Sequence, residues 1–215
     1  MELTVVLTNY LRPANMADLL KSLAEQSIAH RLFAWDNSPD ASFPSGRADW
    51  LIRSSRNAKC SARWWMAARA DTPWVLVMDD DLAPSDPEVL ADTLSALGTH
   101  SPQAVGAAGV VLNPAKEYMA CRHVGREGMR IEAATRVDIL KGRYFALATP
   151  LLGSLGFLSL DAEDDIGVSA SIGGGIVLPW MQDRFRELRT GNESWCRRPD
   201  HQQRREAARR KWFNV

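Results

Sequence analysis

Residues 74–90, WVLVMDDDLAPSDPEVL, place five mostly apolar residues directly before three consecutive aspartates. The apolar run predicts a buried strand, and the aspartates then lie at its carboxyl end. In parallel α/β sheets, ligands collect outside the carboxyl ends of the strands. Three adjacent carboxylates repel one another and resist burial, so they need solvent, hydrogen bonds or a cation. The stretch therefore predicts an acidic site at the end of a buried strand, where a parallel α/β sheet would bind a ligand.

The triplet Asp79, Asp80 and Asp81 allows two explanations. Carboxylate oxygens at this density suit a hard divalent ion, Mg²⁺ or Mn²⁺, which can itself bridge to a diphosphate. The same acids also suit a solvated loop that favours the dipole of the helix that follows. Taken alone, the triplet favours neither explanation over the other.

Toward the N-terminus, short apolar runs alternate with helical patterns, which is typical of βαβ units. The expected fold is therefore α/β, with a mostly parallel central sheet flanked by helices. The expected strands cover residues 3–8, 31–37, 49–54 and 74–78. The expected helices begin at Asn15 as an N-cap, near residue 60, and at a capping-box pair, Ser85 and Glu88, from which the last helix runs to about Leu97.

Toward the C-terminus the pattern is weaker. Residues 104–111 and 134–140 are expected to form strands, and residues 173–175, GGG, a flexible turn. Residues 200–212 have strong helix propensity. No repeat, low-complexity tract or linker divides the chain, so we expect one domain over residues 1–215.

Composition excludes several classes of protein. The chain carries 26 Lys and Arg against 26 Asp and Glu, so no net charge favours a nucleic-acid partner. Between Asp183 and Lys211, however, basic residues outnumber acidic ones by ten to five. The spacing of Cys60, Cys121 and Cys196 fits neither a disulfide framework nor a zinc site, which favours a reducing compartment.

Membrane and secretory segments are not expected. The N-terminus has an acid at position 2 and only a short apolar run, so it predicts a first strand and not a signal peptide. Residues 144–160 carry no charge, but they are shorter than a membrane span and are interrupted by Pro150, Gly153 and Gly156. We expect a buried segment there, in preference to a hairpin that touches a membrane, and a cytoplasmic protein without a transmembrane segment.

Seven short motifs follow one another along the chain: LTNYLRP at 7–13, WDNSPD at 35–40, RNAKCSARWWMA at 56–67, VLVMDDD at 75–81, AVG at 104–106, VDILKGRYFAL at 137–147 and EDDIGVS at 163–169. In these motifs and their order, the chain resembles the GT-A nucleotide-sugar glycosyltransferases over most of its length. The resemblance is to a family-2-like opening and to the exostosin C-terminal catalytic domain.

The resemblance implies a GT-A fold with a nucleotide-binding half, residues 1–98, and an acceptor-side half with a C-terminal helix, residues 99–215. It implies metal-dependent transfer of a hexosyl or N-acetylhexosaminyl group from a nucleoside-diphosphate sugar, most commonly a UDP-sugar, to an acceptor hydroxyl. A glycan or a lipid-linked sugar is the expected acceptor, with peripheral membrane contact in the second case.

By the same resemblance, Thr8 and Arg12 line the nucleotide pocket. Arg12 lies near the diphosphate, where a guanidinium forks onto phosphate oxygens. Asp36 and Asn37 correspond to residues that hydrogen-bond the nucleobase. Each position also has an ordinary explanation, because Thr8 and Arg12 can end a strand and begin a loop, and DNSPD is built of turn residues.

Asn57, Lys59 and Arg63 match the segment that contacts base and ribose and approaches the phosphates in the family. The two tryptophans that follow, Trp64 and Trp65, are expected in the core and not as stacking partners of a ligand.

The family pattern also assigns the acidic triplet. Asp81 becomes the direct metal ligand, Asp79 a contact to ribose or metal, and Asp80 a supporting group. Bound Mn²⁺ or Mg²⁺ together with a nucleoside diphosphate would neutralise these charges. His201 lies in a segment that resembles the family's closing helix, where a histidine approaches the metal or diphosphate; a solvated or structural histidine is the alternative. The arginines around it are candidate diphosphate or acceptor contacts.

A second acidic cluster, Glu163, Asp164 and Asp165, resembles the family's catalytic motif. Asp165 takes the position of the catalytic carboxylate and Asp164 that of the glutamate beside it, although an acidic helix start explains the same letters. If the acceptor attacks from the far face, configuration inverts and Asp165 is a general base. The exostosin-type members are retaining, and both outcomes remain open.

Two other functions compete with sugar transfer. A haloacid-dehalogenase-like phosphatase would use Asp79 as nucleophile and Asp81 as acid and base. It fits less well, because three expected strands precede the triplet and Leu82 follows it. A non-catalytic nucleotide-sugar-binding module is the other alternative, and the presence of both acidic clusters is what it predicts least.

Overall fold

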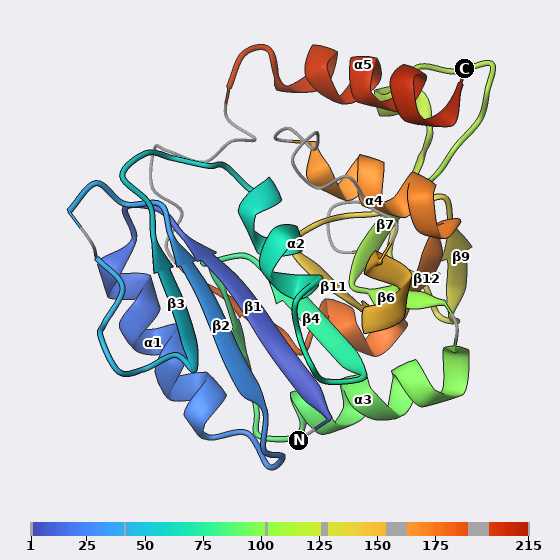
Figure 1. The fold of residues 1–215 in the computed structure, drawn as a ribbon. Helices are drawn as coiled ribbons and strands as arrows, with labels where there is room; N and C mark the ends of the chain where they lie inside the picture. Colours follow the sequence, from blue (N-terminus) through green and yellow to red (C-terminus); the bar gives the residue numbers. More distant parts are fainter. Residues whose placement is uncertain are drawn as a thin grey trace.

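A computed structural model describes residues 2–40, 42–101, 103–125, 129–153, 163–188 and 198–214. Its centre is an eight-stranded sheet with the strand order β3-β2-β1-β4-β11-β6-β12-β9 (Figure 1). The expected α/β fold with a mostly parallel sheet flanked by helices is confirmed.

The first half of the chain builds the parallel part of the sheet. Adjacent strands from β3 to β4 all run in the same direction. The strands are β1 (Leu3–Asn9), β2 (Arg31–Asp36), β3 (Trp50–Arg53) and β4 (Trp74–Met78). The helices are α1 (Pro13–Ala24), α2 (Ser61–Ala67) and α3 (Val89–His100). The predicted alternation of strands and helices is therefore present.

The second half extends the same sheet with both strand directions. Strand β11 (Tyr144–Ala148) runs antiparallel to β4 and to β6 (Ala104–Gly106). Strand β12 (Gly175–Val177) is parallel to β6, and β9 (Thr135–Val137) closes the sheet antiparallel to β12. Since β11 inserts directly beside β4, residues of the second half reach the carboxyl end of the acidic strand.

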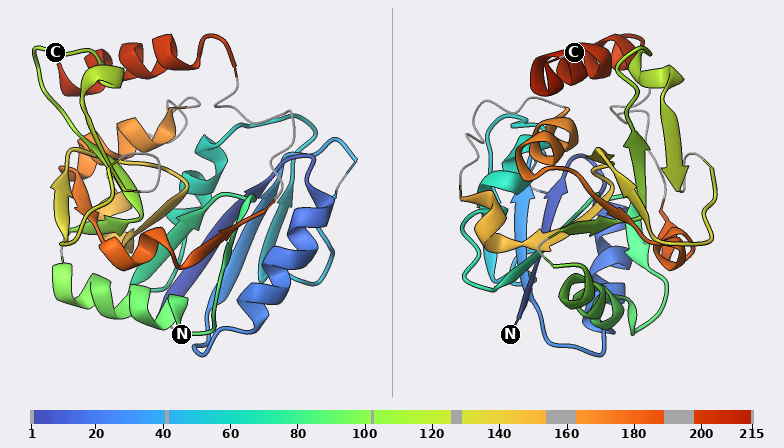
Figure 2. Two further views of the ribbon diagram at one scale, coloured as in Figure 1. Left: turned by 180° about the vertical axis from the view of Figure 1, so that it is seen from behind. Right: turned by 90° about the vertical axis from the view of Figure 1, so that its right-hand side faces the viewer.

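Smaller elements surround this sheet (Figure 2). A three-stranded antiparallel sheet contains β10 (Ile139–Leu140), β7 (Ala108–Val111) and β8 (Arg122–Gly125), and a two-stranded one contains β13 (Phe185–Glu187) and β5 (Leu82–Pro84). The short helices are η1 (Tyr118–Ala120), η2 (Thr149–Leu152) and η4 (Pro179–Gln182). The remaining helices are α4 (Asp164–Ile172) and α5 (His201–Phe213). Helix α5 is the helix expected over residues 200–212.

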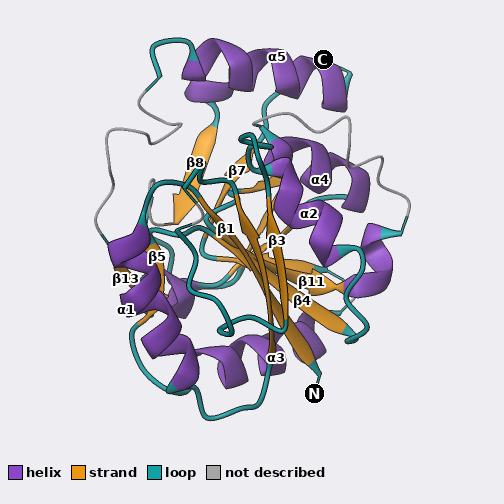
Figure 3. Ribbon diagram, turned by 60° about the vertical axis from the view of Figure 1, so that its left-hand side comes forward, coloured by secondary structure: helices purple, strands orange, loops and turns teal. Residues whose placement is uncertain are grey.

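Alternation along the strands gives each face of the sheet its own core. On β1, Val5 and Leu7 pack toward α1 and α3, whereas Val6 packs toward α2 and α4 (Figure 3). Each fully buried Val or Leu contributes about 1.5 to 3 kcal/mol relative to an exposed one. Trp64 is fully buried against Phe145, with ring centroids 5.0 Å apart, so the expectation of a core tryptophan is confirmed there.

Two predicted helix starts are wrong. Helix α1 begins at Pro13, whose fixed φ suits the first helical turn, and Asn15 lies inside the helix with its side-chain amide donating to the Asp80 carbonyl (3.1 Å). At α3, Ser85 and Glu88 form no capping box. The Asp86 carboxylate instead accepts the bond from the Glu88 amide (3.0 Å). Pro13 therefore begins α1 two residues before Asn15, and at α3 the Asp86 carboxylate satisfies the Glu88 amide in place of a capping box.

Helix α5 packs on α4 and η1 near the carboxyl edge of the parallel strands (Figures 1 and 2). Its Trp212 and Phe213 lie against a small core that includes Tyr118 and Ile166. Of the uncharged segment 144–160, the described part forms β11 and η2, and residues 154–160 lie outside the described residues. No described helix has the length and apolar character needed to cross a bilayer. Cys60 and Cys121 are free thiols.

Candidate active site

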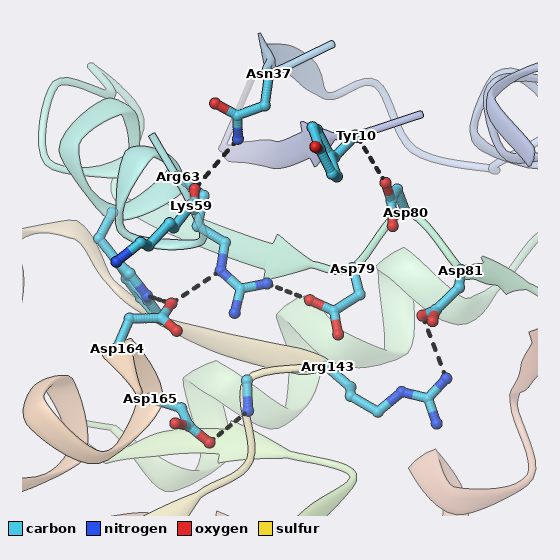
Figure 4. A network of polar contacts seen from close by, with 12 residues as sticks. Tyr10, Asn37, Lys59, Arg63, Asp79, Asp80, Asp81, Arg143, Asp164 and Asp165 are labelled. Carbon is cyan, nitrogen blue, oxygen red and sulfur yellow. Dashed lines mark hydrogen bonds and ion pairs between the residues drawn. The ribbon is translucent and has the colours of Figure 1, made fainter. Parts of the chain in front are cut away.

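A pocket of about 890 Å³ lies at the carboxyl ends of β1, β2 and β4, between α2, α4 and α5. It gathers most of the side chains that the sequence assigns to one site. The predicted residues that line it are Thr8, Arg12, Asn37, Asn57, Lys59, Arg63, Asp79, Asp80, Asp81, Asp164, Asp165 and His201. The carboxyl end of β4 and the start of α4 therefore bring Asp79, Asp80 and Asp81 to the same cavity as Asp164 and Asp165 (Figure 4).

Asp36 is the predicted site residue that does not line the pocket. Its side chain is fully buried at the end of β2. One oxygen accepts bonds from the Asn9 amide (2.9 Å) and the Ser38 backbone (3.1 Å), and the other from the Phe43 backbone (2.8 Å). Asp36 therefore holds the turn that follows β2. This agrees with the alternative that DNSPD is a turn, and not with a contact to the nucleobase.

Asn37 braces the neighbouring loop. Its Oδ1 accepts from the Ala58 amide (2.8 Å), and its Nδ2 donates to the Lys59 carbonyl (3.2 Å). The Lys59 amide donates to Asn57 Oδ1 (2.7 Å). Lys59 itself adopts φ +61, a left-handed conformation that is uncommon for a residue with a side chain. These bonds fix the loop against the end of β2.

Each aspartate of the 79–81 cluster is paired with arginine. Asp79 Oδ1 accepts from Arg63, and Asp80 accepts from Arg12 and from the Tyr10 amide (3.0 Å). The pairs of the third aspartate are Asp81 with Arg143 (3.2 Å) and Asp81 with Arg12 (3.4 Å). Arg12 is therefore shared by Asp80 and Asp81. Figure 4 shows Asp79 directed toward Arg63, Asp80 toward the Tyr10 amide and Asp81 toward Arg143.

Burial outweighs the arginines at Asp79 and Asp80. It raises the pKa of Asp80 to about 7, although the charge of Arg12 opposes the shift. Burial also raises the pKa of Asp79, against the charge of Arg63, and the nearby charge of Asp81 adds to the rise. Negative charge at this edge thus lacks full compensation, and a further cation would favour the ionised forms.

The predicted trio of metal ligands, Asp79, Asp81 and His201, is not gathered into one set. Among the residues that the structure describes, no three His, Cys, Asp or Glu side chains are arranged to hold a metal ion. The reason is the separate arginine pairing of the carboxylates. Magnesium, however, commonly takes one or two carboxylates and completes its shell with water and substrate phosphates. Asp79 and Asp81 both face the pocket, so their oxygens fit such an ion.

The 163–165 cluster is covered by helix α5. Arg204 Nε donates to Glu163 (2.9 Å), and Arg205 forks onto both oxygens of Asp165 (3.1 and 2.9 Å). Asp164 turns the other way, toward the core, where its Oδ2 accepts from Arg63 Nε (3.1 Å) and from the Trp64 indole. Adjacent carboxylates at the start of α4 therefore serve different partners.

The pKa values of these neighbours move apart. Burial raises the pKa of Asp164 to about 6, with Arg63 opposing the rise. Burial acts on Asp165 in the same direction, but the charge and hydrogen bonds of Arg205 lower its pKa below the usual value. Asp165 is thus held firmly as a carboxylate, and Asp164 takes up a proton more readily.

Several pocket residues have no role predicted from the sequence. Lys141, Gly142 and Arg143 lie in the quoted motif at 137–147 without an assigned role. Arg198 and Arg205 are among the arginines around His201, which the resemblance makes candidate diphosphate or acceptor contacts, and both line the pocket. For the pocket residues of η1 and β8, the sequence carries no recognisable signal. The pocket residues without a predicted role are Tyr10, Cys60, Tyr118, Met119, His123, Lys141, Gly142, Arg143, Glu187, Pro199 and Gln202.

The fold occurs in solved glycosyltransferases. The structure of S. aureus TarS 1-349 in complex with UDP-GlcNAc matches with a TM-score of 0.63 and 16% identity, over 90% of this chain and 60% of that one. The mannosyltransferase PcManGT from Pyrobaculum calidifontis, in complex with GDP-Man and Mn²⁺, matches with a TM-score of 0.56 and 18% identity, over 83% and 54%. No protein-family model and no curated sequence matches.

At these identities the likeness is one of fold. The chain spans about 60% of the length of TarS 1-349 and less of PcManGT. The expected resemblance to glycosyltransferases is thereby confirmed at the level of the fold.

Proposed function

We propose that the chain transfers a sugar from a nucleoside-diphosphate sugar to an acceptor hydroxyl, with a divalent cation at the donor diphosphate and a GT-A arrangement of donor and acceptor sides. The observation that carries this proposal is the convergence of Asp164 and Asp165 with the 79–81 cluster on one pocket at the carboxyl ends of the strands. The solved proteins of this fold support it, because two of them hold UDP-GlcNAc and GDP-Man.

The donor nucleotide lies, in this proposal, against the loops after β1 and β2. Thr8, Asn37, Asn57 and Lys59 offer hydroxyl, amide and ammonium groups for base, ribose and phosphate. Arg12 lies between this side and the acids, and its buried Nε has no hydrogen-bond acceptor among the described residues. A buried guanidinium N–H without an acceptor favours an anionic ligand nearby.

Asp81 and Asp79 would hold the cation, Mn²⁺ or Mg²⁺, because both line the pocket. When bound, the cation supplies charge that stabilises the departing nucleoside diphosphate. Asp80 is bonded to the Tyr10 amide and to Arg12, so it supports the loop after β1 and keeps Arg12 in place. His201 lines the same pocket at the start of α5 and is proposed as a neighbour of the cation or diphosphate.

The acceptor enters, in this proposal, between η1, β8 and α5. Met119 is half exposed there, beside Tyr118 and His123, a mixed apolar and polar surface that suits a glycan or a lipid-linked sugar. Asp165 orients the acceptor hydroxyl or takes its proton. Because Arg205 occupies both oxygens of Asp165, this step requires that ion pair to open.

Thermal unfolding with a panel of ligands tests the proposal. UDP-GlcNAc, UDP, GDP-Man and GDP are each added at millimolar concentration with MnCl₂ or with EDTA, and uridine and guanosine serve as controls without phosphate. One diphosphate is expected to raise Tm by several degrees with Mn²⁺, since a ligand at 100 times its Kd stabilises by about 2.7 kcal/mol. A protein stabilised by no nucleotide, but active on p-nitrophenyl phosphate, would point to the phosphatase alternative.

A further inference from the structure

Arg63 connects the two acidic clusters. It lies on α2 with 3% of its side chain exposed, although it belongs to the lining of the pocket. Its Nη1 donates to Asp79, and its Nε donates to Asp164 (3.1 Å). One guanidinium therefore spans a carboxylate at the end of β4 and a carboxylate at the start of α4, as Figure 4 shows.

The surroundings of Arg63 are built to hold this position. The Trp64 indole donates to the same Asp164 oxygen, so that oxygen is fixed from two directions. On the opposite side lies Gly142, where an added Cβ would stand 2.7 Å from Arg63 Nη2 and 3.2 Å from the Asp165 Cβ. Gly142 has no left-handed backbone, so a side chain there would act through space and not through conformation, by displacing the end of Arg63.

We propose that Arg63 is a positioning residue that sets the distance between the donor-side carboxylate Asp79 and the acceptor-side carboxylate Asp164. This inference rests on the proposed sugar transfer, and it replaces the expectation that Arg63 contacts the phosphates. The planar fork of arginine reaches both carboxylates with separate N–H groups, whereas the single ammonium of lysine cannot hold two carboxylates in this fixed relation. Gly142 contributes to the same arrangement, because the absence of a side chain there leaves room for the Arg63 guanidinium.

Two variants disturb the bridge without removing its charge. Arg63→Lys keeps the cation and loses the fork, and Gly142→Ala pushes the flexible end of Arg63 while all charges remain. Removing Arg63 altogether is a poor test, because it strands buried carboxylates and threatens the fold. Gly98→Ala is the matched control, since Gly98 lies on α3 with open space around its Cβ position.

The first readout separates donor binding from turnover. Calorimetry gives the Kd of UDP and of uridine, or of GDP and guanosine, with Mn²⁺ present. Release of the diphosphate from UDP-GlcNAc or GDP-Man gives the rate at saturating donor. Arg63→Lys is expected to lower this rate roughly 100-fold and Gly142→Ala roughly tenfold, while Kd for the diphosphate stays within about threefold. Gly98→Ala is expected to match the parent protein in both.

A loss of diphosphate affinity without a loss of rate would overturn the proposal. If Arg63→Lys weakens the diphosphate far more than the nucleoside and leaves the saturated rate unchanged, Arg63 is a phosphate ligand. If Gly142→Ala leaves the rate at the parent value, the guanidinium position does not govern turnover.

A second readout needs no substrate. The free energy of unfolding is measured for Asp79→Asn, Asp164→Asn and the double variant, first with Arg63 and then with Lys at that position. With Arg63 present, the effects of the two substitutions on the free energy of unfolding are expected to be non-additive, because the guanidinium is the shared partner of both carboxylates. With Lys at that position, the two effects are expected to add. Additivity in both backgrounds would disprove the bridge itself. If no nucleotide binds the parent protein, the proposed function fails, and this cycle alone decides whether Arg63 couples the clusters.

Discussion

The two acidic clusters lie on the same pocket but are neutralised in different ways. Residues 79–81 follow a central strand, β4. They pair with three arginines from separate segments: Arg12 after β1, Arg63 on α2 and Arg143 before β11. Residues 163–165 begin a helix, and two of their carboxylates are forked by consecutive arginines of α5. One cluster is thus held within the body of the sheet, and the other is covered by the last helix of the chain.

This difference appears in the protonation equilibria. Burial dominates at Asp79 and Asp80 and raises their pKa values despite the arginines. At Asp165 the forked pair with Arg205 dominates and lowers the pKa. Asp79 and Asp80 would therefore gain from an added cation, which fits the proposed donor diphosphate with its metal. In the 163–165 cluster, burial raises the pKa of Asp164 in the same way, whereas the charge of Asp165 is compensated by Arg205, so the proposed role of Asp165 requires that ion pair to open.

The largest effect on turnover is expected from a substitution in the 163–165 cluster, which α5 covers. Asp165→Asn, a nearly isosteric change, should lower turnover roughly 100-fold or more, about 2.7 kcal/mol, while donor affinity stays within a few-fold. The physical reason is the loss of a charge that orients or deprotonates the acceptor. Steady-state rates with UDP-GlcNAc or GDP-Man, together with separate binding titrations, measure the two quantities.

Glu163→Gln is the matched control, because Glu163 is likewise forked by an α5 arginine but does not line the pocket. It should weaken the attachment of α5 and leave the chemistry near the parent value. If both variants lose the same activity, the attachment of α5 explains the effect, and Asp165 is not the catalytic carboxylate. Loss of donor affinity in Asp165→Asn would instead assign the 163–165 cluster to the nucleotide.

The next effect concerns pH and distinguishes Asp164 from its neighbour. The pKa of Asp164 is about 6 in the folded chain and near 3.9 in an unfolded one. The folded chain therefore binds the Asp164 proton more tightly than the unfolded chain does. Protonation of Asp164 stabilises the folded state fully below about pH 4, and this stabilisation is lost as the pH rises through about 6.

Asp164→Asn removes this titration. From pH 4 to pH 8, the free energy of unfolding of the parent should fall relative to that of Asp164→Asn by on the order of 2 kcal/mol. Urea unfolding of both proteins at the two pH values gives the comparison. A difference that stays constant with pH would show that Asp164 remains ionised throughout, and that Arg63 compensates its burial fully.

The sequence predicts the fold better where contacts are local. The run at 74–78 and the alternation before it predict the parallel strands, because each apolar stretch carries its own signal. The antiparallel insertion of β11 beside β4 has no such signal, since a buried strand has the same apolar pattern in either direction.

The candidate site follows the same rule. Strand ends predict that Asp79 and Asn37 meet at one edge, because parallel strands share it. Their arginine partners depend on tertiary structure: Arg143 is 62 residues from Asp81, and Arg205 is 40 residues from Asp165. These pairs, not the acids themselves, make the two clusters different.

Within the 79–81 cluster, a smaller effect should separate its members. Asp81→Ala is expected to weaken diphosphate binding in the presence of Mn²⁺ roughly tenfold, and EDTA should do the same to the parent protein. Asp80→Ala should affect binding less and thermal stability more, because Asp80 holds the Tyr10 amide and Arg12. Calorimetry with Mn²⁺ or EDTA and a melting curve for each variant provide the test. Equal affinity with and without Mn²⁺ would remove the cation from the proposal.

The smallest effect is expected at Arg12, which touches the cluster from the donor side. Arg12→Lys should weaken UDP or GDP about fivefold and the matching nucleoside hardly at all, because lysine keeps the charge but loses the planar fork toward phosphate oxygens. Arg184→Lys is the control, since Arg184 also forks onto a carboxylate, that of Asp86, at a place outside the pocket. It should cost some stability and no affinity. If Arg12→Lys weakens nucleoside and diphosphate equally, Arg12 acts by holding Asp80 and the loop after β1, and the donor-side phosphate contact must come from another cation of the pocket.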